Sequence, residues 1–412
     1  MVVGEKGRGT TDSGHQIMND HALSGVRGLP SAAEGDPDAQ RARSRVVVAM
    51  SGGVDSSVAA ALLVEQGYDV AGVMLRLWAD EAPPDDACSP ENGRAGFAHN
   101  RCCMPESVED ARKVCAQLGI PFYLVNAERP FRLRVVDPFV AAYAAGRTPN
   151  PCLACNRHIR FGYLWRYAAA LGARFVATGH YARVRKTGDT FQLLTGIDSE
   201  KDQSYVLYTL GQDDLSHVLF PVGDKTKPNV RKMARDWGLP VSEKADSQDL
   251  CFVAGGSYRH LLRRRVPEAL TPGPILDLSA RRLGTHRGLP LYTVGQRRGL
   301  GVIAGEPLYV LEMRSGDNAL VVGPAEALGQ CEVDLEAVHF VSGCLPTGPV
   351  QVAAKVRYNS PGAPATLIRR NGGARLVFDR PQRAIAPGQG AVFYQDDVLV
   401  GGGLICGVGD RP

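Results

Sequence analysis

Two cysteines three residues apart, and a third far along the chain, are the side chains of this sequence best suited to covalent chemistry. Cys152 and Cys155 stand in a proline-broken segment, and Cys251 follows much later. The stretch 156–161 then begins a predicted helix and carries two arginines and a histidine. Positive charge near a helix N-terminus should lower the pKa of the nearby thiols. The pattern therefore predicts nucleophilic sulfur near neutral pH.

Three other roles for these cysteines stay open on the residues alone. They could be buried and inert, although they have few apolar neighbours in the sequence. A structural zinc site would need four ligands, so Cys102 and Cys103 or His158 would have to contribute. A thioredoxin-like redox pair would require the two thiols directly after a strand in a small fold.

A second candidate site is the glycine-rich sequence SGGVDSS at residues 51–57. Two glycines let backbone N–H groups approach an oxyanion, and the following helix N-terminus adds positive partial charge. We therefore predict a phosphate cradle, with an ordinary strand-to-helix turn as the alternative. The loop lacks the Gly-Lys-Ser/Thr ending of the Walker loop. Asp55 would repel phosphate unless it meets Mg²⁺ or a substrate group.

The elements around this loop predict an α/β domain. The apolar run 46–50 is typical of a buried parallel strand. A helix follows at 58–66 and ends at Gly67, and a second apolar strand covers 70–75. This βαβ unit predicts a parallel sheet. Further strands are expected at 121–126 and 174–178, and further helices at 107–118 and 229–237.

The C-terminal part has a different pattern. Beyond about residue 270, glycine and proline separate short β-rich runs such as 307–313, 319–322 and 350–356. Regular turn spacing of this kind predicts a small β barrel or sandwich. The first 44 residues show no sustained period and are expected to form a flexible tail.

Composition limits the class of protein. A chain of 412 residues is expected to form two or three domains, and 44% hydrophobic with 22% charged residues excludes wholesale disorder. A net charge of +4 excludes a polycation but permits a local basic surface. Ten cysteines are too sparse for a disulfide-stapled secreted scaffold. No signal peptide or membrane-spanning run is evident, so we expect a cytoplasmic protein with reduced thiols and no membrane partner.

The loop at 51–56 resembles the PP-loop of ATP pyrophosphatases. Those enzymes cleave ATP between the α- and β-phosphates and adenylate a carbonyl oxygen. The loop alone leaves several substrates open, including those of small-molecule ligases such as argininosuccinate synthase. A non-catalytic iron–sulfur or nucleotide-sensing RNA-binding protein is an alternative of another class.

A wider resemblance, from Arg45 to Gly407, is to the tRNA-specific 2-thiouridylases. Its motifs are Cys102-Cys103, 148–161, 177–181, 201–205, 220–223, 246–252, 295–301, 355–358, 387–389 and 391–394. The resemblance implies ATP-dependent 2-thiolation of the wobble uridine in Glu, Gln and Lys tRNAs. The C2 oxygen would be adenylated, and sulfur transfer would then release AMP, with pyrophosphate as the other product.

The same resemblance implies a domain order. An adenine nucleotide alpha hydrolase-like PP-loop domain with a parallel sheet would occupy 45–220, after the flexible tail at 1–44. A middle α+β, tRNA-binding domain would occupy 221–330. A small β barrel would complete the chain at 331–410.

The resemblance also assigns roles to residues that match its motifs. Cys155 would be the nucleophile and Cys251 the persulfide carrier, with a transient disulfide between them. ATP with Mg²⁺ would be held by Ala49, Met50, Ser51, Gly52, Gly53, Val54, Asp55, Ser56, Leu75 and Gly179. The tRNA would be contacted by Asn150, Pro151, Cys152, Lys201, Asp202, Gln203, Arg357 and Tyr358. Sulfur would come from a cysteine desulfurase or a sulfur relay protein.

One position departs from the commoner family pattern. Many members have aspartate where this chain has Cys152, and that aspartate is taken as an acid/base group beside the uridine. The other branch has three cysteines, for which a [4Fe–4S] cluster has been proposed. Cys152, Cys155 and Cys251 would then ligate three irons and leave the fourth open to sulfide. The persulfide relay and the cluster both stay open, and Cys102-Cys103 receives no role.

Overall fold

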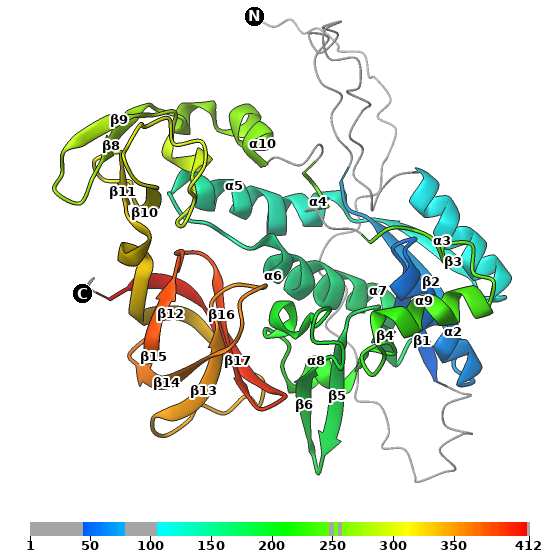
Figure 1. Cartoon of the computed structure of the whole chain (residues 1–412). Helices are drawn as coiled ribbons and strands as arrows, with labels where there is room; N and C mark the ends of the chain where they lie inside the picture. The colour runs from blue at the N-terminus through cyan, green and yellow to red at the C-terminus, as the bar shows by residue number, and fades with distance from the viewer. Residues whose placement is uncertain (1–43, 79–104, 247–250, 254–257, 410–412) are drawn as a thin grey trace, which may run out of the picture.

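The structure is a computed structural model that describes residues 44–78, 105–246, 251–253 and 258–409 (Figure 1). The predicted tail, apart from Ser44, and the Cys102-Cys103 pair lie outside these residues. The described chain forms a parallel-sheet α/β unit, a small mixed sheet and a closed β barrel, as the sequence predicted.

The first unit is built on a five-stranded parallel sheet in the order β3-β2-β1-β4-β7. Its strands are β1 (Arg45–Ala49), β2 (Asp69–Arg76), β3 (Phe122–Asn126), β4 (Phe175–Ala177) and β7 (Val218–Leu219). Alternate residues of β1 enter two different cores. Val46 and Val48 pack with α2 (Val54–Glu65), α3 (Pro105–Gln117) and α9 (Lys227–Asp236). Val47 packs with α7 (Leu164–Ala170) on the other face.

Helix α2 begins at Val54, four residues earlier than the sequence pattern indicated. Its first turn is polar, so it resembled a continuation of the loop. Asp55 in that first turn is favourable because it faces the positive end of the helix dipole. The earlier start matters because it brings the glycine-rich loop directly onto the helix N-terminus.

The cysteine segment lies between β3 and β4 as a run of helical turns. It contains α4 (Glu128–Phe131), a π-helical turn (Arg132–Val136), α5 (Asp137–Ala144), α6 (Pro151–Cys155) and a second π-helical stretch (Asn156–Tyr163) that leads into α7. Single π-helical turns are rare and occur often at functional sites.

A β-hairpin and short helices complete this part of the chain. They are β5 (Ala182–Thr187), β6 (Thr190–Thr195), the 3₁₀ turn Ser204–Leu207 and α8 (Gln212–Ser216). Through β6, the hairpin pairs with the last strand of the C-terminal barrel. The α/β unit and the barrel therefore share an extended sheet.

The middle unit begins with α10 (Tyr258–Arg265), followed by the 3₁₀ turns Pro267–Ala269 and Leu289–Leu291. Its sheet has the order β10-β11-β8-β9. These strands are β8 (Gly273–Leu276), β9 (Arg282–His286), β10 (Tyr309–Arg314) and β11 (Ala319–Gly323). Ile275, Val310 and Leu320 lie in its core.

The C-terminal unit follows the 3₁₀ turn Ala325–Leu328 and is a closed antiparallel barrel. Its strands are β12 (Gly329–Phe340), β13 (Val350–Lys355), β14 (Ala363–Arg370), β15 (Gly373–Arg383), β16 (Gly390–Gln395) and β17 (Val398–Val408). Pairing of β12 with both β15 and β17 closes the barrel. Closure leaves no unpaired barrel edge.

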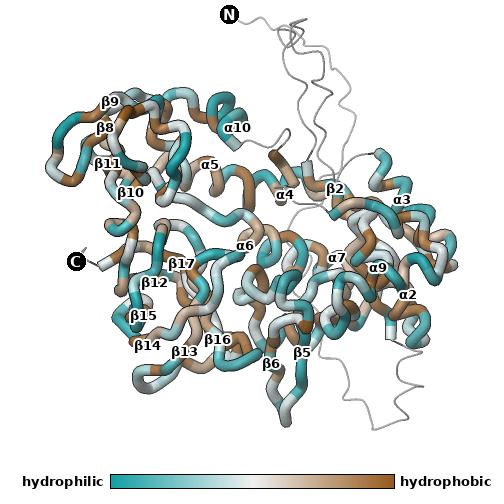
Figure 2. The backbone as a smooth tube through the Cα atoms, in the orientation of Figure 1, coloured by the Kyte–Doolittle hydropathy of each residue, from teal (hydrophilic) through white to brown (hydrophobic). Residues whose placement is uncertain are grey.

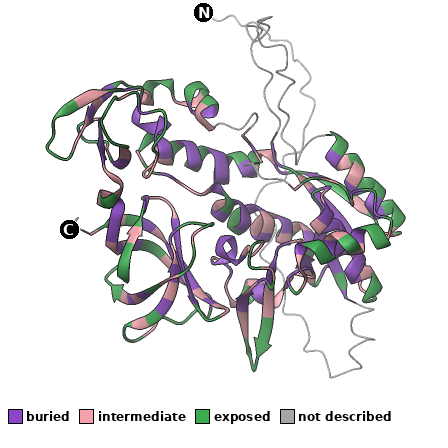
Figure 3. Cartoon of the chain, viewed as in Figure 1, coloured by how far each residue is buried: buried purple, intermediate pink, exposed green. Residues whose placement is uncertain are grey.

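Apolar residues concentrate inside each unit. Figure 2 shows hydrophobic segments along β2, α5 and the barrel strands. In Figure 3, β2 is largely buried, whereas α5 and the barrel strands combine buried residues with more exposed ones. Among the described residues, no helix is both long and apolar enough to cross a membrane.

Candidate functional site

The glycine-rich loop forms a tight turn between β1 and α2. Gly52 has φ +67°, a left-handed conformation that favours glycine, and a Cβ there would overlap the carbonyl oxygen of Ser107. The Ser57 hydroxyl donates to the Gly53 carbonyl at 2.8 Å, and the Ser51 N–H donates to Ser56 Oγ at 3.2 Å. No side chain caps the N-terminus of α2 at Gly53. These features suit an anion at the loop.

The carboxylate of Asp55, which the sequence left without a partner, is neutralised inside the protein. Lys227 Nζ donates to its two oxygens at 2.7 and 2.8 Å, and the Tyr181 hydroxyl donates to it at 2.8 Å. The side chain of Lys227 is only 10% exposed. Burial and the adjacent Asp55 raise the pKa of Tyr181, which therefore stays a hydroxyl donor. The repulsion between Asp55 and a phosphate is accordingly reduced.

The other residues predicted to hold ATP gather around this loop. Gly179 follows β4, and a Cβ there would lie 2.7 Å from the backbone carbon of Asp55 and from the backbone nitrogen of Ser56. Met50 is buried, and Leu75 is partly buried near the end of β2. Ala49 is the last residue of β1. The parallel sheet thus brings its carboxyl-end residues beside the loop, where α/β proteins commonly bind ligands.

Lysines that contact the loop were not found from the sequence. Besides Lys227, Lys244 donates to the Gly52 carbonyl at 2.9 Å and to Asp110 at 2.7 Å. For Lys227, the sequence did contain an indication of a carboxylate partner, because this lysine is the first residue of α9. A cation at a helix N-terminus opposes the helix dipole, so such a lysine calls for a carboxylate partner.

The cysteine helix begins with a side-chain cap. Asn150 accepts a hydrogen bond from the Cys152 N–H at 3.0 Å, and Pro151 takes the first helical position, which suits its missing N–H. Cys152 is exposed, whereas Cys155 is 7% exposed. The two thiols of the motif therefore face different surroundings.

Cys155 and Cys251 belong to the same apolar cluster. Cys155 is buried in it, and the partly buried Cys251 packs against it. Phe252 anchors the second cysteine, because its ring contacts the ring of Phe131 at 5.7 Å and that of Phe139 at 5.2 Å. The fold thus brings together two cysteines that are far apart in sequence.

The expectation of a lowered pKa was wrong for Cys152. Desolvation by the surrounding protein raises the pKa of its thiol although the residue is exposed, and the nearby Arg160 guanidinium lowers it only in part. Arg160 is bonded to the buried His180 at 2.9 Å through Nε2. Burial and Arg160 hold the pKa of His180 well below its usual value, so its neutral ring accepts this hydrogen bond.

The residues predicted to contact tRNA from the 201–203 segment are engaged within the protein. Lys201 pairs with Asp246 at 3.0 Å. Asp202 accepts from the N–H of Gly196 and of Ser204, both at 3.1 Å, and its side chain is 5% exposed. Gln203 accepts from the Tyr181 N–H at 3.1 Å. These contacts give the segment a structural role at the centre of the site.

A surface near Cys152 combines predicted tRNA-contacting residues from separate parts of the chain. Burial raises the pKa of Tyr358 to about 12, and the charges of Asp202 and Cys152 add to the increase. The three side chains are therefore close enough to interact electrostatically. Tyr358 is 37% exposed, and its ring lies edge-on to Tyr205 at 5.9 Å. The neighbouring Arg357 donates to the Arg383 carbonyl at 3.0 Å.

The described cysteines do not fit an iron–sulfur site in this arrangement. Within residues 44–78, 105–246, 251–253 and 258–409, no three Cys, His, Asp or Glu side chains are grouped so that they could hold a metal ion. Cys152 is exposed, whereas Cys155 and Cys251 share the apolar cluster.

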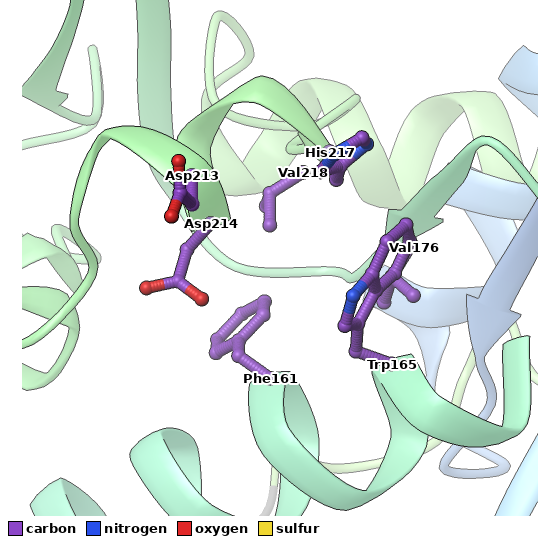
Figure 4. Close-up of a pocket in the computed structure, with 7 residues that line it drawn as sticks. All are labelled: Phe161, Trp165, Val176, Asp213, Asp214, His217 and Val218. Carbon is purple, nitrogen blue, oxygen red and sulfur yellow. The ribbon is translucent and has the colours of Figure 1, made fainter. Parts of the chain in front are cut away.

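Two hollows flank the cysteine helix on the side of α8. Figure 4 shows the first, where Phe161 of the second π-helical stretch lies near Asp214 and Trp165 of α7 lies near His217. The second, of about 600 Å³, is lined by Arg157 and His158 of the second π-helical stretch and by His339 of the barrel, among others. Neither hollow is lined by Cys152, Cys155 or the glycine-rich loop.

Three family models together match most of the chain. Residues 44–255 match the tRNA methyl transferase HUP domain, which extends past the domain boundary predicted at 220. Residues 259–324 match the tRNA methyl transferase PRC-barrel domain, and residues 331–405 match the aminomethyltransferase beta-barrel domain. A solved 4-thiouridine synthetase–RNA complex with bound ATP covers 55% of this chain and 51% of its own at 16% identity. Its TM-score is 0.31.

Curated relatives match almost end to end. The tRNA-specific 2-thiouridylase MnmA of Roseiflexus sp. (strain RS-1) is 49% identical over 381 residues, which is 88% of this chain and 99% of the relative. The protein of the same name from Chloroflexus aurantiacus (strain ATCC 29366 / DSM 635 / J-10-fl) is 49% identical over 88% of this chain and 98% of its own. Similarity of this extent leaves one conclusion: the chain belongs to the family of tRNA-specific 2-thiouridylases.

Proposed function

We propose that this protein uses ATP to place sulfur on C2 of the wobble uridine of tRNA, with Glu, Gln and Lys tRNAs as substrates. The observation that carries the proposal is the meeting of Cys155 and Cys251 in one apolar cluster, in a chain with nearly full-length thiouridylase relatives. A uridine oxygen is a poor leaving group, so the reaction needs activation before sulfur can replace oxygen.

The glycine-rich loop and its lysines would serve the activation step. Backbone N–H groups of the loop and of the α2 N-terminus would bind ATP phosphates. Attack of the uridine C2 oxygen on the α-phosphorus forms the C2–O–P bond and expels pyrophosphate. Lys227 and Lys244 bring positive charge to the loop, where the leaving group develops negative charge.

The two clustered cysteines would serve the sulfur step. The terminal sulfur of a Cys251 persulfide attacks C2, the C2–O bond breaks, and AMP leaves. The Cys155 thiolate then attacks Sγ of Cys251, which forms a Cys155–Cys251 disulfide and releases the sulfur on C2 as 2-thiouridine. A dithiol reductant returns the disulfide to two thiols. Burial of Cys155 in the apolar cluster restricts water near this exchange.

The exposed site elements would bind the RNA. Tyr358 offers a ring on which a base can stack, close to Cys152. Asn150 and Pro151 fix the helix start that presents Cys152. Because Cys152 retains its proton more strongly than an ordinary thiol, it is suited to donate a hydrogen bond beside the uridine.

The proposal includes Mg²⁺ as a companion of ATP but does not include an iron–sulfur cluster. Both oxygens of Asp55 accept hydrogen bonds from Lys227, so Mg²⁺ would arrive on the ATP phosphates rather than on a free Asp55 carboxylate. The cluster alternative requires Cys152, Cys155 and Cys251 to converge, which the described arrangement does not support. We therefore favour the persulfide relay, supplied in the cytoplasm by a cysteine desulfurase or a sulfur relay protein.

Replacement of the two clustered cysteines tests the proposal. Cys155→Ser and Cys251→Ser should each abolish thiolation of tRNA, while tRNA-dependent ATP–pyrophosphate exchange continues. Cys344→Ser is the matched control, because Cys344 is an exposed free thiol in the barrel unit. Full thiolation by either variant would refute the relay, and exchange that needs a small metabolite instead of tRNA would refute the function.

Anaerobic purification separates the relay from the cluster. The relay predicts a colourless, iron-free protein that transfers sulfur once it has been persulfidated. An absorbance band near 400 nm that tracks with activity, and that is lost in Cys152→Ser, would favour the cluster instead.

A further inference from the structure

The segment that leads to Cys251 is attached to the nucleotide-binding loop through a shared cation. Lys227 Nζ lies 2.9 Å from Asp246 while it also holds Asp55 of the loop. Asp246 receives two further cations, Arg231 at 2.6 Å and Lys201 at 3.0 Å. Burial alone would raise the pKa of Asp246, but the hydrogen bonds and charges of Lys227 and Lys201 outweigh it and lower the pKa to about 2. Asp246 is therefore a fixed anion at neutral pH.

Independent contacts hold the same segment just before Asp246. Arg231 on α9 donates to the carbonyl oxygens of Ser242 and Lys244 at 3.3 and 3.0 Å. Lys244 in turn donates to the Gly52 carbonyl of the loop. Helix α9 packs against α2, the helix that begins at the loop, and Figure 1 shows the two helices side by side. The segment is therefore connected to the loop that would bind ATP in two ways: through Asp246 and Lys227 to Asp55, and through Lys244 to Gly52.

The chain length from this anchor to the sulfur carrier is short. Cys251 is five residues beyond Asp246. Five residues span at most about 17 Å, so the anchor limits how far Cys251 can lie from the loop. Cys251 itself packs against the apolar cluster that contains Cys155.

We propose that Asp246 is a positioning residue that ties the Cys251 segment to the nucleotide-binding loop through Lys227. The inference rests on the proposed function, because it concerns the delivery of sulfur by Cys251. Sulfur transfer depends strongly on position, since a displacement of about 1 Å can cost about 100-fold in rate. Adenylation uses the loop itself and does not require Cys251. Loss of Asp246 should therefore separate the two steps.

The test compares Asp246→Asn with two other variants of the full chain. Asp246→Glu keeps the charge on a longer side chain. Asp236→Asn is the matched control, because it removes an exposed ion pair with Lys232 on the same helix α9 without touching the loop. Each protein is assayed for tRNA-dependent ATP–pyrophosphate exchange and for single-turnover sulfur transfer after persulfidation with polysulfide. The alkylation rate of Cys251 by iodoacetamide is followed by mass spectrometry.

We expect Asp246→Asn to keep exchange within about threefold of the unmodified protein and to transfer sulfur at least about tenfold more slowly. Its Cys251 should be alkylated about threefold faster or more, because the segment has lost its anchor. Asp246→Glu should recover most of the transfer rate. Asp236→Asn should match the unmodified protein in all three measurements.

Two results would overturn the inference. One is normal sulfur transfer and normal alkylation in Asp246→Asn. The other is an equal fall in exchange and transfer with unchanged alkylation, which would place Asp246 in the nucleotide step. If Asp246→Asn does not fold, Arg231→Met loosens the same segment and carries the same expectations. If the unmodified protein transfers no sulfur to tRNA, the proposed function fails, whereas the alkylation rates still test the anchor.

Discussion

Gly179 lies against the start of α2, and its replacement by alanine should damage the glycine-rich loop, the proposed ATP site, selectively. A Cβ at this position would lie 2.7 Å from the backbone carbon of Asp55 and the backbone nitrogen of Ser56, where ordinary contact begins at 3.4 Å. Relief of the overlap requires a shift of about 0.7 Å, and neither neighbour is a flexible side chain. Gly179 has no left-handed φ, so alanine adds a steric clash without backbone strain.

The size of the effect follows from this overlap. Overpacking of this kind costs about 1–3 kcal/mol, which corresponds to about 5- to 150-fold in an equilibrium constant. We expect Gly179→Ala to lower kcat/KM for ATP in the exchange assay within that range, because the displaced backbone belongs to the turn that we propose binds the ATP phosphates. Binding of tRNA, measured by gel shift, should change little.

Gly316→Ala is the matched control. Gly316 lies in the turn between β10 and β11, has an ordinary φ, and would place its Cβ in open space. It should keep the activity and the thermal midpoint of the unmodified protein or gain slightly in stability. Unchanged kcat/KM for ATP in Gly179→Ala would refute the reasoning, even with a lowered midpoint, because the clash would then be relieved away from the loop.

Three further predictions concern charge. Arg160→Met should raise the pKa of Cys152 further and slow its alkylation by iodoacetamide at pH 8, and an unchanged rate would contradict an effect of the Arg160 charge on this thiol. The folded-state pKa of Asp246 lies below its ordinary value of 3.8, so its stabilising contribution is present above about pH 4 and is lost as the pH falls toward 2. Urea unfolding between pH 5 and 2.5 should therefore show a shallower loss of stability in Asp246→Asn, and an identical slope would disprove this. Lys227→Met should raise the KM for ATP about tenfold because Asp55 is left uncompensated, and Asp55→Asn should restore part of it, whereas an unaltered KM would contradict this role.

Sequence patterns predicted the elements that depend on neighbouring residues. The apolar runs of β1 and β2, with SGGVDSS between them, were enough to predict the βαβ unit, while the phosphate cradle stays a prediction. The regular turns after residue 270 predicted a small β barrel or sandwich, and the structure shows the barrel. The start of α2 was placed too late because its first turn is polar, although that turn is helical.

Side-chain partners from distant segments could not be predicted in the same way. Lys227 meets Asp55 across 172 residues, and Lys244 meets Gly52 across 192. The position of Lys227 at the start of α9 indicated that it needs a carboxylate partner, but not that this partner is Asp55. The pKa of Cys152 was predicted in the wrong direction because local arginines were visible in the sequence, while the desolvation of this exposed residue's thiol by neighbouring protein was not.

The sequence by itself determined the type of chemistry: a phosphate-binding turn and three cysteines whose motifs resemble those of thiouridylases. Backbone turns and helix starts depend on residues a few positions apart, so they can be inferred from local patterns. Only the tertiary structure decided that Cys155 and Cys251 share a buried cluster, that Cys152 stays exposed, and that Lys227 joins Asp55 to Asp246. Burial and Coulomb interactions depend on distance in space, and the packing of remote segments sets that distance.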